Sequence, residues 1–493
     1  ISKDMEFKES YGVDDSWKNM SWYANIDYNY RNLYFAQVAM SLESSSRFGE
    51  NADGLSLGGV KWAYYPSVQL GWAISNEKWF PKTSALNYFL LKAGYDITGN
   101  DDINNYAART SFQVMQYLNN TSVHMLNNIG NDKITYEKTG QWNVGFKSYL
   151  LNNRLGVDFN YYQKHTTNLL TLKTFENPVA GINNYWSNGG SMDNQGFEVT
   201  VTTKPVVSKD FNIELGASVG HYENKIKTLP NDDKLYVDGV KNAQGYTSSI
   251  YGTDNIATIV GQPVGSFYGY KTAGVFATDA QAKAAGNNDY LYYLDETGAK
   301  QYFKAGDMHF VDINKDGKID EADKTIIGNP NPDIYGNIFG SVMWKNFTLT
   351  LGLNYSLGND VYNYSRSVLE SGSNFYNQTI AMANRWRHEG QVTDMPRLSY
   401  GDPMGNARFS DRWIEDGSYL RLKTVNISYK VPVKGDWIQG LTIWAEANNL
   451  FTITKYLGSD PEFSAANGVL YQGIDPGNVA LSRTFTFGMK INL

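Results

Sequence analysis

The sequence predicts an all-β protein whose strands form a transmembrane antiparallel β-barrel with long extracellular loops. Three observations lead to this prediction: segments of alternating apolar and polar residues, a high content of tyrosine and tryptophan, and short turns interspersed with long connections. Successive side chains of a strand point to opposite faces, so an alternating segment has one apolar face and one polar face. In a barrel, lipid covers the apolar face and the polar face lines a lumen.

The alternation is clearest in the last residues of the chain. Between Phe485 and Leu493 every odd position is apolar, and every even position is polar or glycine. Most such segments run for about 9–11 residues, the length that crosses a bilayer when the strand is tilted. We expect about fourteen to sixteen strands in all. The pattern recurs in segments at 22–30, 142–146, 155–161, 211–219, 347–355 and 441–447.

The composition narrows the class of protein. The chain has 493 residues, a mean hydropathy of −0.45 and no apolar run of about 18 residues, so a transmembrane helix is excluded. Its 36 tyrosines and 12 tryptophans suit a membrane–water interface, where one end of the ring is wet. The absence of cysteine excludes disulfides and thiolate chemistry, and the net charge of −7 argues against a nucleic-acid partner.

Connections of two kinds separate the alternating segments. Leu151-Asn152-Asn153-Arg154 and Lys345-Asn346 are short hairpin turns. Short turns on one side and long loops on the other are typical of outer-membrane barrels, whereas a soluble sandwich keeps both sets short. The long connections, rich in Gly, Asn, Asp and Ser, are expected at about 164–195, 222–340, 356–417 and 455–480.

One loop segment matches the template of a calcium-binding loop. Residues 312–323 place Asp312, Asn314 and Asp316 at positions 1, 3 and 5, with glycine at position 6. These side chains converge as the chain curls, and Lys318 offers its backbone carbonyl. Asp323 stands at position 12, where the longer Glu is usual. We expect a structural Ca²⁺ site here, and the alternative is a turn of the same shape that is stable without metal.

Nothing in the sequence marks a catalytic site. It contains no G-x-S-x-G, H-E-x-x-H or P-loop motif, and its five histidines show no metal-ligand spacing. Aromatic residues in the long loops are the best indication of a ligand, because flat rings stack on sugar rings. Interface girdles and loop cores use such residues equally well. The candidates for ligand contact are Tyr185, Trp186, Trp386 and Trp413.

Further motifs occur in a fixed order along nearly the whole chain. They are Ser44–Gly49, Tyr65–Val68 with Gly71-Trp72, Gly94-Tyr95 with Thr98–Ile103, Asn188–Met192 before Gly196-Phe197-Glu198, Gly261–Tyr270, Gly306-Asp307 leading into the calcium-like loop, Gly417–Leu422, and Asn448–Tyr456 with Asp460-Pro461-Glu462. Each motif is modest alone, but the ordered set is highly specific and resembles the SusC/RagA-type TonB-dependent outer-membrane transporters of Bacteroidetes. Leu493 departs from the aromatic residue that commonly ends these proteins.

The resemblance implies that residues 1–493 are the C-terminal part of one large, 22-stranded TonB-dependent barrel. We expect the plug domain, the TonB-contacting box and the first strands of the family to lie outside these residues. The implied location is the outer membrane of a Gram-negative bacterium, and the implied activity is import of oligosaccharides, or of peptides, without chemistry on the substrate. The implied partners are a SusD-like surface lipoprotein, TonB-ExbB-ExbD through the N-terminal part, and outer-membrane lipid.

Two other readings of the sequence stay open. One is a secreted β-rich protein that binds or hydrolyses glycans, since the carboxylates are plentiful enough to include a glycosidase pair. The other is a passive porin, which needs neither a lid partner nor TonB. Turnover of glycan by the purified protein favours the first alternative, and growth rescue that is independent of TonB favours the second.

Overall fold

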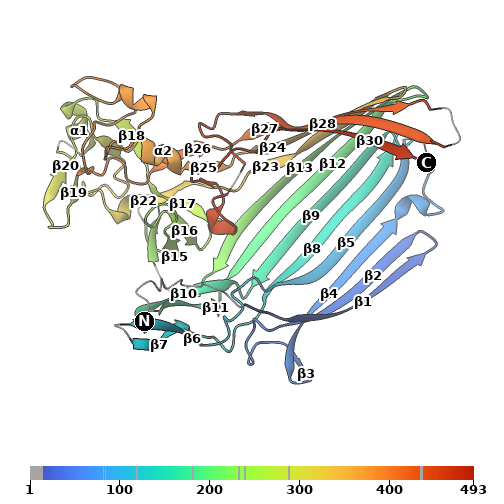
Figure 1. Ribbon diagram of the computed structural model, residues 1–493, viewed down its shortest axis with the longest axis horizontal. Coiled ribbons are helices and arrows are strands. Elements are labelled where there is room, and N and C mark those ends of the chain that lie inside the picture. Colours follow the sequence, from blue (N-terminus) through green and yellow to red (C-terminus); the bar gives the residue numbers. More distant parts are fainter. Residues whose placement is uncertain are drawn as a thin grey trace, which may run out of the picture. The chain divides into compact units, whose positions relative to one another are not determined.

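The computed structural model describes residues 15–81, 83, 85–117, 120–179, 182–230, 234–237, 240–286, 289–433, 437–462 and 464–493. These residues form mostly antiparallel strands (Figure 1). The chain divides into two compact units, one comprising Ile1–Gly71, Ala93–Trp142 and Lys164–Ser191 and the other Trp72–Lys92, Asn143–Gln163 and Met192–Leu493. That residues 1–493 form part of one 22-stranded barrel stays a prediction.

The longest sheet keeps the order of the chain. It counts fourteen strands among the described residues, and successive members are hydrogen-bonded neighbours, as in an up-and-down meander. The predicted all-β, antiparallel fold is confirmed. The strands are β1 (Asn19–Tyr30), β2 (Tyr34–Ser45), β4 (Val60–Ala73), β5 (Leu86–Asn100), β8 (Glu137–Leu150), β9 (Leu155–Thr167), β12 (Ser191–Val207), β13 (Phe211–Thr228), β23 (Ile334–Trp344), β24 (Phe347–Leu357), β27 (Tyr419–Val431), β28 (Gly440–Thr454) and β30 (Thr484–Asn492), with β3 (Leu55–Leu57) beside β4.

The two faces of this sheet have opposite character. Asn426 of β27 pairs with Glu446 of β28, and the Asn426 amide donates to the Glu446 carboxylate at 3.0 Å. Glu446 in turn pairs with Thr486 of β30, so one face carries a polar row. One position further along, Ile427 and Phe487 lie on the other face, where 52% and 79% of their surfaces are exposed. An exposed apolar face opposite a polar one is the pattern of a barrel wall in lipid.

The predicted hairpin turns are confirmed. Leu151, Asn152 and Asn153 have φ of 54°, 56° and 62° in the turn between β8 and β9. Lys345, with φ of 52°, lies between β23 and β24. Positive φ is the conformation that a tight turn between antiparallel strands needs, and Asn adopts it far more readily than Leu does. The turn therefore rests on its asparagines, while Leu151 is strained.

The long connections carry secondary structure of their own. In the first unit β6 (Ser111–Tyr117) pairs with β7 (Asn120–Asn128), and β10 (Leu170–Val179) pairs with β11 (Ile182–Asn188). The other unit contains β14 (Lys234–Val237), β15 (Val240–Ser248), β16 (Ile256–Ile259), β17 (Ser266–Tyr270), β18 (Thr272–Val275), β19 (Tyr292–Leu294), β20 (Lys300–Tyr302), β21 (Met308–Phe310), β22 (Lys324–Gly328), β25 (Asp360–Asn363), β26 (Ile414–Asp416) and β29 (Ile474–Asp475).

Helices in the described residues are short. They are α1 (Asp279–Ala285), α2 (Tyr364–Leu369) and the 3₁₀ turns η1 (Ile74–Asn76), η2 (Glu321–Asp323), η3 (Ile380–Asn384), η4 (Asp411–Trp413) and η5 (Val469–Tyr471). None of the helices within the described ranges has the length and apolarity needed to span a membrane.

The largest cores of the second unit lie in its connections, within residues 229–333, 358–418 and 455–483, here called the loop assembly. One core surrounds Phe303 and Phe310, and the other surrounds Phe267 and Trp413. The Arg408 guanidinium lies 4.8 Å from the Phe310 ring centroid and is shared with neighbouring rings. The loop assembly is therefore a folded layer with its own buried residues. In the first unit, smaller clusters form around Ala63, Tyr65 and Tyr136 and around Ile103, Ala107 and Ile134.

Candidate functional site

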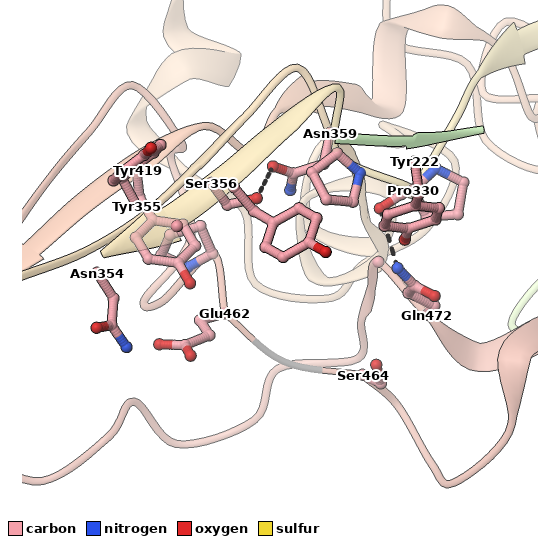
Figure 2. Close-up of a pocket in the computed structure, with 15 residues that line it drawn as sticks. Tyr222, Pro330, Asn354, Tyr355, Ser356, Asn359, Tyr419, Glu462, Ser464 and Gln472 are labelled. Atoms are coloured by element: carbon pink, nitrogen blue, oxygen red, sulfur yellow. Dashed lines mark hydrogen bonds between the residues drawn. The ribbon is translucent and has the colours of Figure 1, made fainter. Parts of the chain in front are cut away.

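A cavity of about 520 Å³ lies where the main sheet meets the loop assembly of the second unit (Figure 2). Four tyrosines from consecutive strands of the sheet line it: Tyr222 of β13, Tyr335 of β23, Tyr355 of β24 and Tyr419 of β27. We call it the tyrosine cavity. Its other walls come from the loop assembly, which contributes Pro330, Pro332, Asn359, Pro461, Glu462, Ser464, Gln472 and Gly473.

Glycines in the neighbouring strands make room for two of these rings. Tyr335 pairs with Gly220, and Tyr355 pairs with Gly336. A Cβ on Gly220 would lie 2.5 Å from the Tyr335 ring, and a Cβ on Gly336 would lie 2.8 Å from the Tyr355 hydroxyl oxygen. Each ring therefore lies across a glycine backbone, and a larger residue at either glycine displaces it. Because Tyr335 and Gly336 are neighbours in β23, the two rings lie on opposite faces of the sheet, and the Tyr335 ring shares its face with Tyr222 and Tyr419.

Hydrogen bonds hold the tyrosine hydroxyls and the loop wall in place. Tyr355 donates to the Ser218 carbonyl at 2.9 Å, and Tyr222 donates to the Asn331 side chain at 3.1 Å. The Tyr222 and Tyr335 rings meet edge to face, with centroids 5.9 Å apart. Figure 2 shows the Gln472 amide donating to the Pro330 carbonyl at 3.2 Å. These contacts fix the wall side chains relative to one another.

One buried arginine organises the acidic corner of the cavity. The Arg421 side chain on β27 is only 2% exposed, and its Nη2 lies 2.5 Å from the Asp460 carboxylate. Its Nη1 lies 2.9 Å from Glu462 Oε2, and its Nε donates to Thr452 Oγ1 at 3.0 Å. One cation facing two carboxylates leaves a net charge of −1, and Glu462 is held at the edge of the cavity.

The four aromatic residues predicted to contact ligand do not converge. None of them lines the tyrosine cavity. Tyr185 and Trp186 lie on β11 of the first unit, where Trp186 packs against a buried cluster. In the loop assembly Trp386 donates from its indole to the Ala277 carbonyl at 3.2 Å, and Trp413 donates to the Arg408 carbonyl at 3.2 Å.

Trp413 belongs to a buried core of the loop assembly, whereas Trp386 is partly buried. Trp413 has no exposed surface, and a Cβ on Gly306 would lie 2.5 Å from the Trp386 ring, so the Gly306 backbone covers that indole. The Trp413 ring is thus enclosed by protein in this structure. Stacking of ligand on the four predicted aromatics stays a prediction.

The calcium-like loop has the predicted curl. The Asp312 carboxylate accepts from the backbone N–H of Asp316 at 3.2 Å and of Gly317 at 2.7 Å. Gly317 has a φ of 81°, the left-handed conformation that the sharp turn needs. Asn314 Oδ1 accepts from the Asp316 N–H at 3.0 Å, and Asp316 Oδ1 accepts from the Lys318 N–H at 2.8 Å. Each oxygen keeps a second lone pair for a cation.

Asp323 fits the calcium template less well. It is fully buried, and its two oxygens accept from the backbone N–H groups of Ile313 and Asp320, each at 2.9 Å. Burial raises the pKa of Asp323 to about 6, against the backbone hydrogen bonds, which lower it. Within the described ranges no three His, Cys, Asp or Glu side chains converge as metal ligands. Asp312, Asn314 and Asp316 suit a cation, whereas Asp323 closes the loop onto itself.

The sequence reasoning did not select the residues of the tyrosine cavity. Asp460-Pro461-Glu462 belongs to one of the ordered motifs, Tyr355 ends a predicted alternating segment, and Tyr335 falls within the long connection expected at 222–340. The one usable signal in the sequence is a tyrosine at the loop end of several consecutive strands. Which of these tyrosines face one another depends on the strand register, and a single sequence does not give the register.

Comparison with known proteins places the fold in one class. No protein-family model matches the chain. The RagAB peptide transporter superposes with a TM-score of 0.75 at 22% sequence identity, covering 96% of this chain and 48% of the other. The meander with one apolar face, and the folded loops at its strand ends, therefore have the fold found in the RagAB transporter.

Sequence relatives narrow the class. TonB-dependent receptor P3 of Formosa agariphila is 28% identical over 96% of this chain and 45% of its own length. SusC of Bacteroides thetaiotaomicron is 28% identical over 96% of this chain and 43% of its own length. The predicted resemblance to SusC/RagA-type TonB-dependent receptors is confirmed, and with it the outer-membrane location. The chain spans about half the length of these relatives, which are named as receptors and not as enzymes.

Proposed function

We propose that the whole protein imports an oligosaccharide across the outer membrane with energy from TonB, and that it performs no chemistry on the substrate. The observation that carries the proposal is similarity over 96% of the chain to proteins named TonB-dependent receptor and SusC. The chain contributes barrel wall, extracellular loops and part of the ligand cavity. TonB-ExbB-ExbD acts through a part of the protein outside these residues.

The tyrosine cavity supports an oligosaccharide over a peptide as the substrate. Its wall combines fixed aromatic rings with amides and one carboxylate, the groups that hold the apolar face and the hydroxyls of a sugar. RagAB is named a peptide transporter, which makes peptides the second candidate substrate.

We further propose that a SusD-like surface lipoprotein covers the loop assembly. Phe375 and Ile380 expose 90% and 91% of their surfaces, and the Phe375 and Tyr400 rings stack with centroids 4.9 Å apart. Large apolar side chains gathered on a loop, away from the strands that face lipid, are typical of a protein interface.

Substitution of the apolar loop residues tests this partner. We expect Phe375→Asp with Ile380→Asp to abolish copurification of a SusD-like lipoprotein with the full-length protein. Asn377→Asp is the control, because it adds charge to the same exposed loop without removing apolar surface. Equal copurification with both variants would contradict the assignment of this surface.

Ca²⁺ is proposed as a structural ion of the loop assembly. Asp312, Asn314 and Asp316 would hold it together with the Lys318 carbonyl, and the ion would supply a fixed positive charge that ties the loop. The support is the curl of the loop and the hydrogen bonds that aim its oxygens inward. In this proposal Asp323 closes the loop mainly by accepting hydrogen bonds from backbone N–H groups.

Growth on single glycans tests the proposed import. A deletion strain should fail to grow on at least one oligosaccharide that the parent uses, and the full-length gene should restore growth. Normal growth of the deletion strain on every glycan that the parent uses would contradict the proposal. Release of reducing sugar by the purified protein would instead favour the glycan hydrolase.

A further inference from the structure

We propose that the tyrosine cavity is a binding subsite for an uncharged sugar residue and that it disfavours acidic sugars such as uronates. The inference rests on the proposed import of oligosaccharides and specifies that the sugar bound here is uncharged. Three features carry it: the fixed aromatic wall, the mixed hydrogen-bonding groups and the charge of the lining (Figure 2).

The aromatic wall is built to present rings instead of hydroxyls. The Tyr222 hydroxyl donates to Asn331 at 3.1 Å, and the Tyr335 hydroxyl donates to Glu198 at 3.4 Å. The Tyr335 ring lies on the Gly220 backbone. Rings whose hydroxyls are occupied and whose backs are packed offer mainly an apolar face. The C–H face of a pyranose ring matches such a surface.

The polar groups of the cavity suit hydroxyls. Asn354 and Gln472 carry amides, which both donate and accept hydrogen bonds, and Glu462 carries a carboxylate, which accepts them. A sugar hydroxyl likewise donates and accepts. Figure 2 shows Asn354 and Glu462 on the same side of the cavity. Its volume of about 520 Å³ lies within the usual range for small-molecule sites.

Charge decides against acidic ligands. Glu462 is the carboxylate of the lining, and no Lys, Arg or His belongs to it among the described residues. The nearby cation, Arg421, is 2% exposed and already faces Asp460 and Glu462. A ligand carboxylate would lose water beside a like charge without gaining a cation, which is unfavourable. An uncharged sugar incurs no such cost.

A binding measurement tests the inference on the full-length protein, purified with its lid partner in detergent. Calorimetry would compare malto-, xylo- and manno-oligosaccharides with oligogalacturonate and a tripeptide. We expect binding of a neutral oligosaccharide, and no stronger binding of the acidic one or the peptide. Glu462→Gln keeps the shape but removes the charged acceptor, so neutral binding should weaken about tenfold while the acidic ligand gains.

Tyr335→Ala should weaken binding of the neutral oligosaccharide about tenfold or more through lost stacking. Tyr302→Ala, a partly exposed tyrosine outside the cavity, is the control and should bind normally. Preferred binding of the acidic sugar or the peptide would overturn the inference, and so would normal neutral binding by both cavity variants. If a neutral oligosaccharide is imported but its binding does not depend on these residues, only the inference about the cavity fails. If no oligosaccharide is imported, the proposed function fails as well.

Discussion

The ion pair between Asp307 and Arg397 allows a quantitative prediction about the loop assembly. The Asp307 side chain has no exposed surface, and its oxygens lie 2.8 Å and 3.0 Å from Nε and Nη2 of Arg397. Asn406 donates to the same carboxylate at 3.0 Å, and the Lys304 N–H donates at 2.9 Å. The pair therefore ties together two segments that lie 90 residues apart in the sequence.

Arg397→Met removes the cation and leaves the Asp307 carboxylate buried. Breaking a buried pair in this way costs about 3–5 kcal/mol. The Arg397 side chain is 37% exposed, so water screens part of the attraction, and we expect about 3 kcal/mol. That energy raises the population of the locally open state roughly a hundredfold.

Limited proteolysis of the folded protein measures the opening. When opening is fast relative to cleavage, the trypsin cleavage rate at Lys300 and Lys304 follows the open population and should rise roughly a hundredfold in Arg397→Met. Lys204→Met is the control, because Lys204 and Glu214 lie 3.6 Å apart with about half of each side chain exposed. Such a pair contributes at most about 1 kcal/mol. Equal cleavage of the two variants would refute the reasoning.

Three further predictions concern single sites. Chelation with EDTA should lower the melting temperature of the loop assembly, and Asp316→Ala should abolish this effect. Asp295→Ala, which lies outside the calcium-like loop, is the control and should preserve it. A melting temperature that EDTA leaves unchanged would count against bound Ca²⁺. Burial raises the pKa of Asp360, so its contribution to stability is present below about pH 4 and lost as the pH rises through the raised pKa. Asp360→Asn should therefore flatten the decline of denaturant stability above pH 4, and an unchanged profile would contradict this. Leu151→Gly should relieve a strained positive φ and stabilise the hairpin by about 1 kcal/mol, seen as a higher temperature for the heat-induced gel shift, and a lower temperature would contradict the turn geometry.

The strands of the main sheet were predictable because their signal is local. The alternation at 347–355 corresponds to β24 (Phe347–Leu357), and that at 485–493 to β30 (Thr484–Asn492). One face of each strand meets lipid and the other a polar surface, so the pattern persists along the strand whatever its neighbours are. The turn at Leu151 was equally predictable, because its asparagines favour the left-handed backbone conformation of a tight turn.

The loop assembly was not predictable to the same degree. Phe303 and Trp413 stand among polar residues and glycines, a composition that reads as exposed loop, yet both are fully buried. Their burial comes from contacts with distant segments, which no local period reports. The tyrosine cavity was not predictable for a related reason. Tyr335 becomes part of its wall only because the strand register places it across from Gly220.

Uptake in cells with and without active TonB tests the central claim most directly. Cells that express the full-length protein and its lid partner would be given a radiolabelled neutral oligosaccharide at a concentration too low for diffusion through porins. The account predicts accumulation in the periplasm that stops when TonB is deleted or the proton gradient is collapsed. Equal accumulation with and without TonB would contradict active import and identify the barrel as a passive pore.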